Sequence, residues 1–252
     1  MKKTLIEINI KDFPIEIRDY LKDVDVYDTS CSKEAQTLYI SNGYYLKIGK
    51  KGSLYLENKL TRKFNRHFLS VKVEKYTSQD KDYLLTKEAK GQDCLYYLKE
   101  PKKLIKVLAY YLVYLHSINS YSFPFSEAMN HYFNSKKEEY NIGCALTKYK
   151  SMTKEDAIRI KKERLNKLRY DSVIHGDCCL PNIILNSYLP SALIDLGQAG
   201  IGDHHIDIYW LLWSLEYNLK TDKYNDYFLE LYGKDKVNED ILELIAALEI
   251  LG

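Results

Sequence analysis

The sequence predicts an α+β fold with two lobes, a small lobe made of a β-sheet with one helix and a larger lobe that is mostly helical. Strand-like runs fill much of the first third of the 252 residues, and apolar residues with helical spacing dominate after about residue 92. A polar loop between two strand-like runs interrupts those helices. With 46% hydrophobic and 29% charged residues, the composition is that of a folded globular protein.

The small lobe begins with β-strand signals. Strand-like runs occupy residues 36–40, 44–48, 69–76 and 82–86. Asn42-Gly43 separates the first two runs, and Asn-Gly in that position is a strong signal for a hairpin. Residues 54–64 carry apolar side chains at helical spacing. We therefore expect residues 1–86 to form a small lobe with a sheet and a helix.

A polar segment follows, and we expect a hinge at residues 87–91 and a larger helical lobe at 92–252. Pro101 suits the first position of a helix, and a 3.6-residue apolar period continues from it. Thr153 and Asp156 resemble a capping box that opens a helix running to about residue 168. Further helices are expected at about 204–219, 222–232 and 238–250, with Gly233 as a stop and Asn238 as an N-cap.

Charge and cysteine usage exclude several classes of protein. A net charge of +2 gives no strong electrostatic case for binding nucleic acid, and it does not attract cationic ligands to the molecule as a whole. The five cysteines form no zinc-type pairs, so we expect reduced thiols. No apolar stretch approaches the roughly 18 residues of a membrane span, and the charged N-terminus does not resemble a signal peptide. The expected location is the cytoplasm.

The most informative residues are two acids and an amide at fixed spacing. Asp177 stands five positions before Asn182, and Asp195 follows thirteen positions later, at the end of an apolar run. Phosphoryl transfer needs a carboxylate to hold the attacking hydroxyl, and an amide oxygen and a second carboxylate to hold metal ions. This is the spacing of a kinase catalytic loop and its metal-binding Asp. A turn with Gly176 and Pro181 is also compatible with an ordinary loop, but the two halves together favour the kinase interpretation.

A kinase also needs a positive charge at the nucleotide phosphates. Lys47 lies in mid-strand among apolar neighbours, where the strand-borne lysine of kinases lies. Its partner should be an acid on the next helix, and Glu57 is the acid there. A lysine in a strand is otherwise most often a solvated surface residue. No G-x-G-x-x-G precedes this strand, although the hydroxyl-rich run around Ser32 could bring hydroxyl and N–H groups near phosphate or could be a plain turn.

Histidines occur beside the catalytic loop and at a helix start. We expect His175 to brace the loop by hydrogen bonds. The run Asp203-His204-His205 is compatible with a zinc site, but it opens a helix, where Asp203 is a good cap, and adjacent side chains point apart. We expect no metal there. Asp207 is expected to point inward and hold the catalytic loop.

These residues resemble a known family. His175-Gly176-Asp177-x4-Asn182, followed by Asp195-Leu196-Gly197-x2-Gly200, is similar to the aminoglycoside 3′-phosphotransferases, which have a protein-kinase-like fold, and a weaker likeness covers almost the whole chain. The resemblance implies ATP and Mg²⁺ as cofactors. It implies that the adenine packs against Tyr45 and bonds to the backbone of Lys87 and Ala89, and that Ser32 lies near the β-phosphate.

The acceptor side departs from the resemblance. Family members usually carry a strongly acidic loop before the catalytic strand, and here no acid lies between Glu139 and Glu155. Family members often have acids on the helix that follows the metal-binding motif, and Tyr217 and Asn218 occupy the matching positions here. The substrate-binding candidates are Asp177, Glu155, Asp156, Glu249 and the terminal carboxylate of Gly252.

We therefore expect an enzyme that transfers the γ-phosphate of ATP to a hydroxyl of an aminoglycoside, as an antibiotic resistance kinase does. Residues 1–86 would be its nucleotide-binding lobe, and residues 92–252 its catalytic and acceptor-binding lobe. One alternative is a kinase of the same fold that acts on a less cationic hydroxyl compound. A second is a nucleotide-binding protein without transfer activity, which is disfavoured because Lys47, Asp177, Asn182 and Asp195 are all present.

Overall fold

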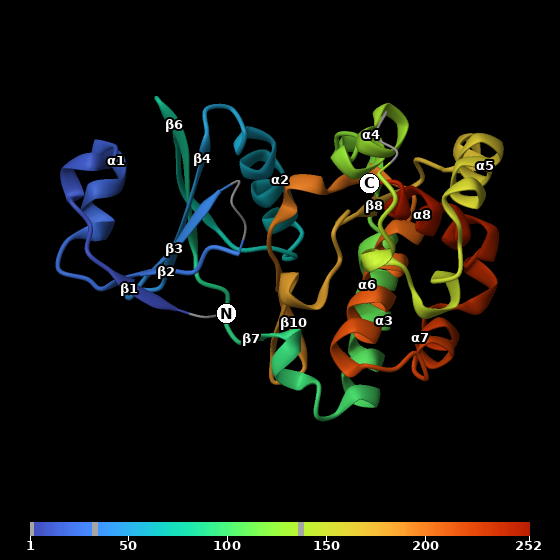
Figure 1. Ribbon diagram of the computed structural model, residues 1–252. Helices are drawn as coiled ribbons and strands as arrows, with labels where there is room; N and C mark the ends of the chain where they lie inside the picture. The colour runs from blue at the N-terminus through green and yellow to red at the C-terminus, as the bar shows by residue number, and fades with distance from the viewer. Residues whose placement is uncertain (1–2, 32–34, 136–138) are drawn as a thin grey trace. The chain divides into compact units, whose positions relative to one another are not determined.

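The computed structural model describes residues 3–31, 35–135 and 139–252. The chain divides into two compact units (Figure 1). The first comprises Met1–Lys90 and Ser191–Gly197, and the second comprises Gly91–Pro190 and Gln198–Gly252. The division at residue 90 falls inside the segment predicted as a hinge. The sequence did not indicate that residues 191–197 return to the first unit.

The first unit is built on a six-stranded sheet with the order β1-β2-β3-β4-β6-β5, in which all neighbours are antiparallel. The strands are β1 (Thr4–Ile6), β2 (Val26–Asp28), β3 (Gln36–Ile40), β4 (Tyr44–Lys50), β5 (Val73–Ser78) and β6 (Lys81–Lys87). The predicted hairpin is confirmed, because Ile40 on β3 faces Tyr44 on β4. Gly43 in its turn has φ 87°, a conformation that favours glycine.

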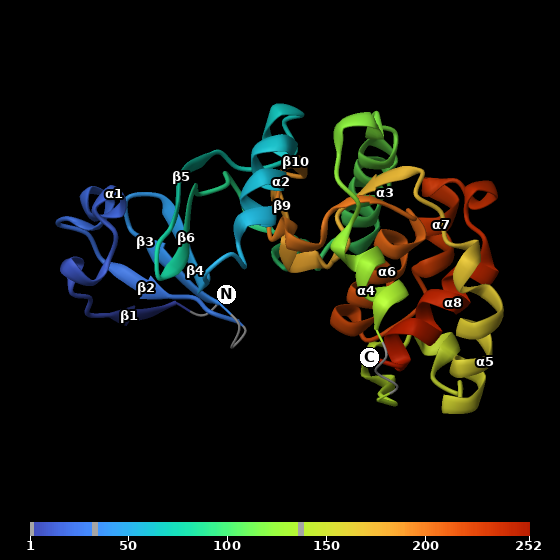
Figure 2. The ribbon, with the colours of Figure 1, turned by 90° about the horizontal axis from the view of Figure 1, so that it is seen from above.

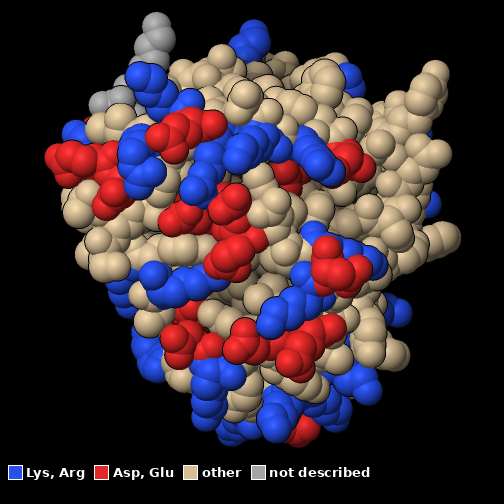
Figure 3. Space-filling model, turned by 90° about the vertical axis from the view of Figure 1, so that its right-hand side faces the viewer, with Lys and Arg blue, Asp and Glu red and all other residues tan. Residues whose placement is uncertain are grey.

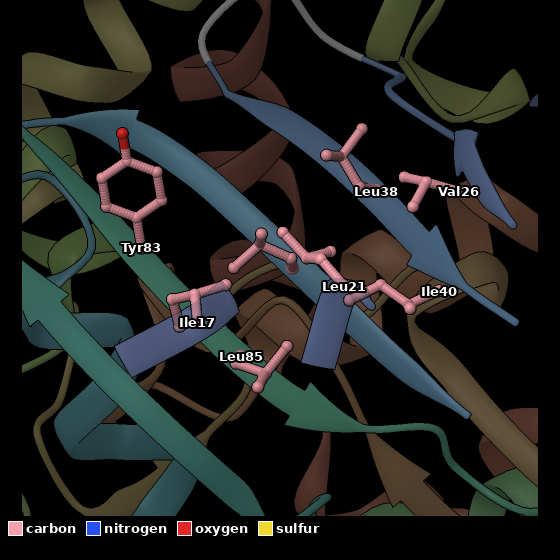
Figure 4. Packing of buried hydrophobic residues seen from close by; sticks show 8 residues of the cluster. Ile17, Leu21, Val26, Leu38, Ile40, Tyr83 and Leu85 are labelled. Carbon is pink, nitrogen blue, oxygen red and sulfur yellow. The ribbon is translucent and has the colours of Figure 1, made fainter. Parts of the chain in front are cut away.

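Helices α1 (Ile15–Arg18) and α2 (Tyr55–Arg66) complete this unit, with short 3-10 helices at Ile10–Asp12 and Asp19–Leu21. Figure 4 shows Ile17 and Leu21 packed over Leu38, Ile40 and Leu85 of the sheet. These side chains are at most 2% exposed. Full burial of such a side chain contributes roughly 1.5–3 kcal/mol, so this core stabilises the sheet that carries Lys47.

Helices dominate the second unit. They are α3 (Pro101–His116), α4 (Glu127–Asn134), α5 (Lys154–Arg164), α6 (His205–Leu219), α7 (Asn225–Tyr232) and α8 (Glu239–Ile250). α8 packs against α5 and α6, and α3 packs against α7 (Figure 2). The predicted capping box of Thr153 and Asp156 and the predicted N-cap Asn238 are both confirmed. Helix α4 was not predicted.

Short strands shape the loops of the second unit. β7 (Gln92–Asp93) pairs with β9 (Ile183–Asn186), and β8 (Ser172–Ile174) pairs with β11 (Gly200–Gly202), both antiparallel. β10 (Leu189–Leu193) crosses the boundary at residue 190, and a 3-10 turn, Leu196–Gln198, follows. Other 3-10 helices are Cys94–Tyr97, Ser120–Ser122, Ile142–Cys144, Thr147–Tyr149, Leu165–Lys167, Leu180–Asn182 and Lys234–Lys236.

The surface near α5 carries both signs of charge. Figure 3 shows acidic and basic side chains intermixed on this face. Ion pairs such as Arg159–Asp156 and Arg164–Glu243 connect some of them. Among the described residues, no helix has the length and apolarity needed to cross a membrane.

Candidate active site

The catalytic loop follows β8 and is shaped by a glycine. Gly176 has φ 83°, and a Cβ atom at this position would lie 2.4 Å from the backbone oxygen of Gln198. A side chain would therefore meet both backbone strain and a steric clash. This packing accounts for His-Gly-Asp in this chain where protein kinases have His-Arg-Asp.

Asp207, on the first turn of α6, binds the backbone of the catalytic loop. Its two carboxylate oxygens accept hydrogen bonds from the backbone N–H groups of His175 and Gly176, each at 2.8 Å. His116 Nε2 lies 3.1 Å from the same carboxylate, and His116 Nδ1 lies 2.8 Å from the hydroxyl of Tyr232. Burial opposes the charge of Asp207, but these hydrogen bonds outweigh burial and lower its pKa. The expectation that Asp207 points inward to the loop is confirmed.

The loop brings Asp177 and Asn182 together. Asn182 Nδ2 donates to the backbone oxygen of Asp177 and to its Oδ2, both at 3.0 Å. The amide nitrogen is thereby engaged, which leaves the amide oxygen as the group that could bind a cation. His175 is buried, and its Nδ1 accepts a 3.2 Å hydrogen bond from the Asp177 N–H. His175 therefore braces the loop, as predicted.

A cavity of about 690 Å³ lies beside Asp177. The described residues that line it are Glu127, Ala128, Asn130, His131, Tyr132, Asn134, Gly176, Asp177, Gln198, Trp210 and Glu249. Three of them are acids, and none of these described residues is a lysine or arginine. A concave site lined by one sign of charge concentrates ligands of the opposite sign. The cavity is therefore suited to a cation.

Glu249 on α8 is the most perturbed acid of this cavity. It is half-buried and accepts a hydrogen bond from the Tyr132 hydroxyl. Burial raises the pKa of Glu249 to about 7, the hydrogen bond from Tyr132 opposes the rise, and the negative charge of Asp177 adds to it. A cation in the cavity would favour the ionised carboxylate.

The first unit contains a second cluster of charged groups. Lys47 Nζ on β4 lies 2.8 Å from Glu57 Oε2 on α2 and 2.6 Å from Asp195 Oδ1. Burial opposes the positive charge of Lys47, but the two carboxylates outweigh it and raise the pKa of the ammonium group. The side chain of Asp195 remains 53% exposed, and its backbone has φ 59°, a left-handed conformation that Asp tolerates.

Two residues that the sequence did not indicate, Asp82 and Ser70, position this cluster. Asp82 on β6 is fully buried at the start of α2, the helix that carries Glu57. Its carboxylate accepts hydrogen bonds from Gly52 N, Leu54 N, Tyr76 Oη and Ser78 Oγ. The strand before Asp195 is fixed by a 2.8 Å hydrogen bond from Ser70 Oγ to the Leu193 oxygen.

Two of the residues assigned to adenine binding by resemblance, Tyr45 and Lys87, lie at one end of the paired strands β4 and β6. Tyr45 lies opposite Thr86 in the sheet. Lys87 ends β6, and its N–H donates to the Lys72 oxygen at 2.9 Å. Ala89 follows and is half-buried. Ser32 lies outside the described residues.

The predicted acceptor anions are only partly brought together. Glu249 lies at the cavity with Asp177, but Glu155, Asp156 and Gly252 are not among its described lining residues. Asp156 forms the capping box of α5 and an ion pair with Arg159 at 3.2 Å. Glu155 lines a separate surface hollow. The backbone oxygen of Gly252 accepts from Ser135 Oγ at 3.3 Å. Asp156 on the first turn of α5 is therefore engaged locally, and the acceptor roles of Glu155, Asp156 and Gly252 stay predictions.

Sequence reasoning missed several lining residues, among them Glu127, Tyr132 and Trp210. Glu127 and Tyr132 belong to the unpredicted α4. Trp210 lies in an almost continuously apolar stretch of α6, which gave no reason to single it out.

The cluster Asp203-His204-His205 brings ligand atoms within 4.8 Å of one another, but hydrogen bonds already engage them. His205 Nδ1 lies 2.6 Å from Asp203 Oδ1, and His205 Nε2 accepts from the Asn238 N–H at 2.8 Å. His204 Nε2 lies 3.1 Å from the Lys236 oxygen. These contacts tie the start of α6 to the start of α8, which is a structural role.

The chain has a kinase-type catalytic loop, a lysine–glutamate pair and two compact units. These features are those of a phosphotransferase, and the comparison with protein families agrees with this class. Residues 36–244 match the model of the phosphotransferase enzyme family, so the chain belongs to that family. A curated relative from Lactococcus lactis, described as a probable aminoglycoside 3′-phosphotransferase, is 37% identical over 98% of each chain.

Solved structures share the fold. An aminoglycoside phosphotransferase of Streptomyces rimosus, determined with ADP and streptomycin, has a TM-score of 0.70 at 18% identity and covers 97% of this chain and 99% of its own. A choline kinase of Streptococcus pneumoniae has a TM-score of 0.61 at 16% identity and covers 94% of this chain and 88% of its own. The predicted protein-kinase-like fold is confirmed, and the fold alone does not distinguish between acceptors.

Proposed function

We propose that this protein transfers the γ-phosphate of ATP to a hydroxyl group of an aminoglycoside. The observation that carries the proposal is the cavity beside Asp177, whose described lining includes Glu127, Asp177 and Glu249 but no lysine or arginine. Its volume of about 690 Å³ lies within the range typical of sites for small molecules. An aminoglycoside carries several ammonium groups on sugar rings with hydroxyls, and each ammonium that leaves water needs a partner.

Asp177 is the proposed catalytic residue. The acceptor hydroxyl oxygen attacks the γ-phosphorus, the bond from that phosphorus to the β–γ bridging oxygen breaks, and ADP leaves. The hydroxyl proton passes to the carboxylate of Asp177. The 3.0 Å hydrogen bond from Asn182 fixes the direction of this carboxylate, and Asp207 fixes the loop beneath it.

Lys47, paired with Glu57, would hold the nucleotide phosphates in the first unit. Asn182 and Asp195 would bind Mg²⁺, which prefers oxygen ligands, because each presents oxygen and the nitrogen of Asn182 is already engaged. The metal would offset the negative charge that develops on the phosphates. Since the Lys87 N–H donates to Lys72, an adenine would use the Lys87 carbonyl oxygen and the Ala89 N–H.

A less cationic acceptor, such as an amino alcohol, is the alternative. The similar choline kinase shows that the fold is compatible with such a substrate. Several acids around one cavity suit several ammonium groups better than a single one, and this favours the aminoglycoside.

A panel of acceptors separates the two. ADP release should be measured with kanamycin, neomycin, ribostamycin, choline and a neutral sugar, against a background without acceptor. The proposal expects turnover with at least one aminoglycoside and little with choline or the sugar. Turnover with choline alone would favour the alternative. Nucleotide binding without transfer to any acceptor would mean that the protein binds nucleotide but is not a transferase.

A further inference from the structure

The chain has two tryptophans, and both lie on α6. Trp210 lines the cavity together with Asp177 and Glu249, whereas Trp213, one turn further along, is not among the described lining residues. Trp210 is half-buried, so part of its indole is accessible from the cavity. No step of the proposed transfer uses this aromatic surface.

The indole of Trp210 is held in place on two sides. Its ring centre lies 5.4 Å from that of Trp213 at an interplanar angle of 81°, and 6.2 Å from that of Tyr209 at 89°. Trp213 is itself fixed, because its Nε1 donates to the Gly143 oxygen at 3.2 Å and its ring stacks on Tyr217 at 5.2 Å. A ring that is fixed before the ligand arrives loses little entropy on binding.

The charge around Trp210 indicates what it contacts. The carboxylates of Glu249 and Asp177 line the same cavity as Trp210. A cation attracted by these carboxylates would come close to the indole. Aromatic rings attract cations through their π-electrons, and tryptophan does so most strongly. Such a contact occurs at the end of the same helix, where Nζ of the C-cap residue Lys220 lies 4.2 Å from the ring centre of Tyr217.

We propose that Trp210 is a specificity-determining residue whose indole packs against an ammonium-bearing ring of the acceptor, while Glu249 balances its charge. The inference rests on the proposed function and adds to it a recognition surface. The aromatic contact compensates for acids that are missing from the loop between Glu139 and Glu155. It favours acceptors whose amino groups are attached to a compact ring over acceptors that are merely cationic.

Three substitutions distinguish the contribution of the aromatic ring to acceptor binding from those of the N–H group and of side-chain volume. Trp210→Phe keeps an aromatic face and loses the N–H, Trp210→Leu keeps apolar volume, and Trp210→Ala loses both. The KM for kanamycin should rise about threefold or less in the Phe variant and roughly five- to thirtyfold in the Leu and Ala variants, the range of a partly desolvated cation–π contact. The KM for ATP should not change.

Trp213→Phe keeps an aromatic ring against Trp210, so it is the matched control on the same helix and should leave both KM values within about twofold of the wild type. It also makes Trp210 the sole tryptophan, so indole fluorescence excited beyond the tyrosine band reports on that residue alone. Titration of this variant with kanamycin, in the presence of ADP and Mg²⁺, should change the emission with saturation. Absence of a change would overturn the proposal even if a Trp210 variant failed to fold.

The kinetic outcomes also distinguish the inference from the function on which it rests. If the wild-type protein turns over no aminoglycoside, the proposed function fails. If it does turn them over and Trp210→Leu keeps the wild-type KM, the inference fails and the function stands. If Trp210→Phe is as impaired as Trp210→Leu, the residue acts through its N–H on Glu249, and the aromatic contact is refuted.

Discussion

The charged cluster of the first unit and the cavity of the second unit differ in how closely they follow the kinase pattern. Lys47, Glu57 and Asp195 form a compact ion-pair cluster from residues that the motif spacing predicts. The acceptor cavity combines Asp177 with residues of α4, α6 and α8, and several of these could not be assigned from the sequence. The chemistry of phosphate transfer restricts which residues can form the charged cluster. The cavity is less restricted, because many different surfaces can balance the charge of the acceptor.

This difference predicts separable effects. Changes in the first unit should act on the use of nucleotide, and changes in the cavity should act on the acceptor. A variant that changed both equally would weaken the distinction, and the following substitutions are ordered from the largest expected effect to the smallest.

Asp195→Ala should abolish turnover, because the proposed Mg²⁺ site loses its carboxylate and Lys47 loses one of its two anionic partners. Raising the Mg²⁺ concentration should restore little activity. Kinetics at several Mg²⁺ concentrations test this, with binding of kanamycin measured by calorimetry as the control that should stay unchanged. Wild-type turnover would mean that the Asp-Leu-Gly segment is only a structural turn.

Asp177→Ala should lower kcat by on the order of 10²–10⁴, which is the usual contribution of a positioned acid–base group. ATP binding, measured by calorimetry, should remain close to that of the wild type because the residue belongs to the other unit. A variant that kept most of its kcat would remove Asp177 from the proposed mechanism.

The acceptor KM should depend on pH through Glu249, whose pKa is raised to about 7 by burial. An ammonium ligand binds the ionised carboxylate, so the KM should fall as pH rises from about 6 to 8. The fall should be up to roughly tenfold, as the ionised fraction grows. Because the folded pKa is raised, the free protein should lose stability as pH rises from about 4.5 to 7.

Glu249→Gln is the control for this effect. It should raise the acceptor KM at pH 7.5 and flatten the pH dependence, while the titration of the acceptor's own amines remains. An unchanged pH profile in Glu249→Gln would show that another group titrates.

Tyr232→Phe should have the smallest effect. It removes the hydroxyl beside His116 Nδ1, and with it one contact of the network that leads through Asp207 to the catalytic loop. The loss of one neutral hydrogen bond corresponds to a roughly two- to tenfold lower kcat with both KM values unchanged. A change in KM without a change in kcat would contradict a positioning role.

The sequence predicted the residues whose signals are local. The hairpin before Lys47, the capping box of Thr153 and Asp156, and the spacing from Asp177 to Asn182 all lie within short stretches of chain. The pairing of Lys47 with Glu57 also followed, because the helix contains a single acid.

The cavity could not be predicted because its signals are not local. Helix α4 has only eight residues, and the hydroxyl of Ser126, which precedes it, donates to the Gln198 oxygen instead of capping the helix. Trp210 resembles a core residue in a helix that is apolar on nearly all sides, and only the folded packing leaves it half-buried at a cavity. The acceptor role of Asp156 stays a prediction, and its local capping role already engages its carboxylate.

The most direct test of the central claim is the identity of the product. Wild-type protein and Asp177→Ala should be incubated with ATP, Mg²⁺ and kanamycin, and the antibiotic analysed by mass spectrometry and phosphorus NMR. The account predicts a phosphate monoester on one hydroxyl with the wild-type protein and almost none with Asp177→Ala. Unmodified kanamycin with the wild-type protein, or equal product with the variant, would contradict it.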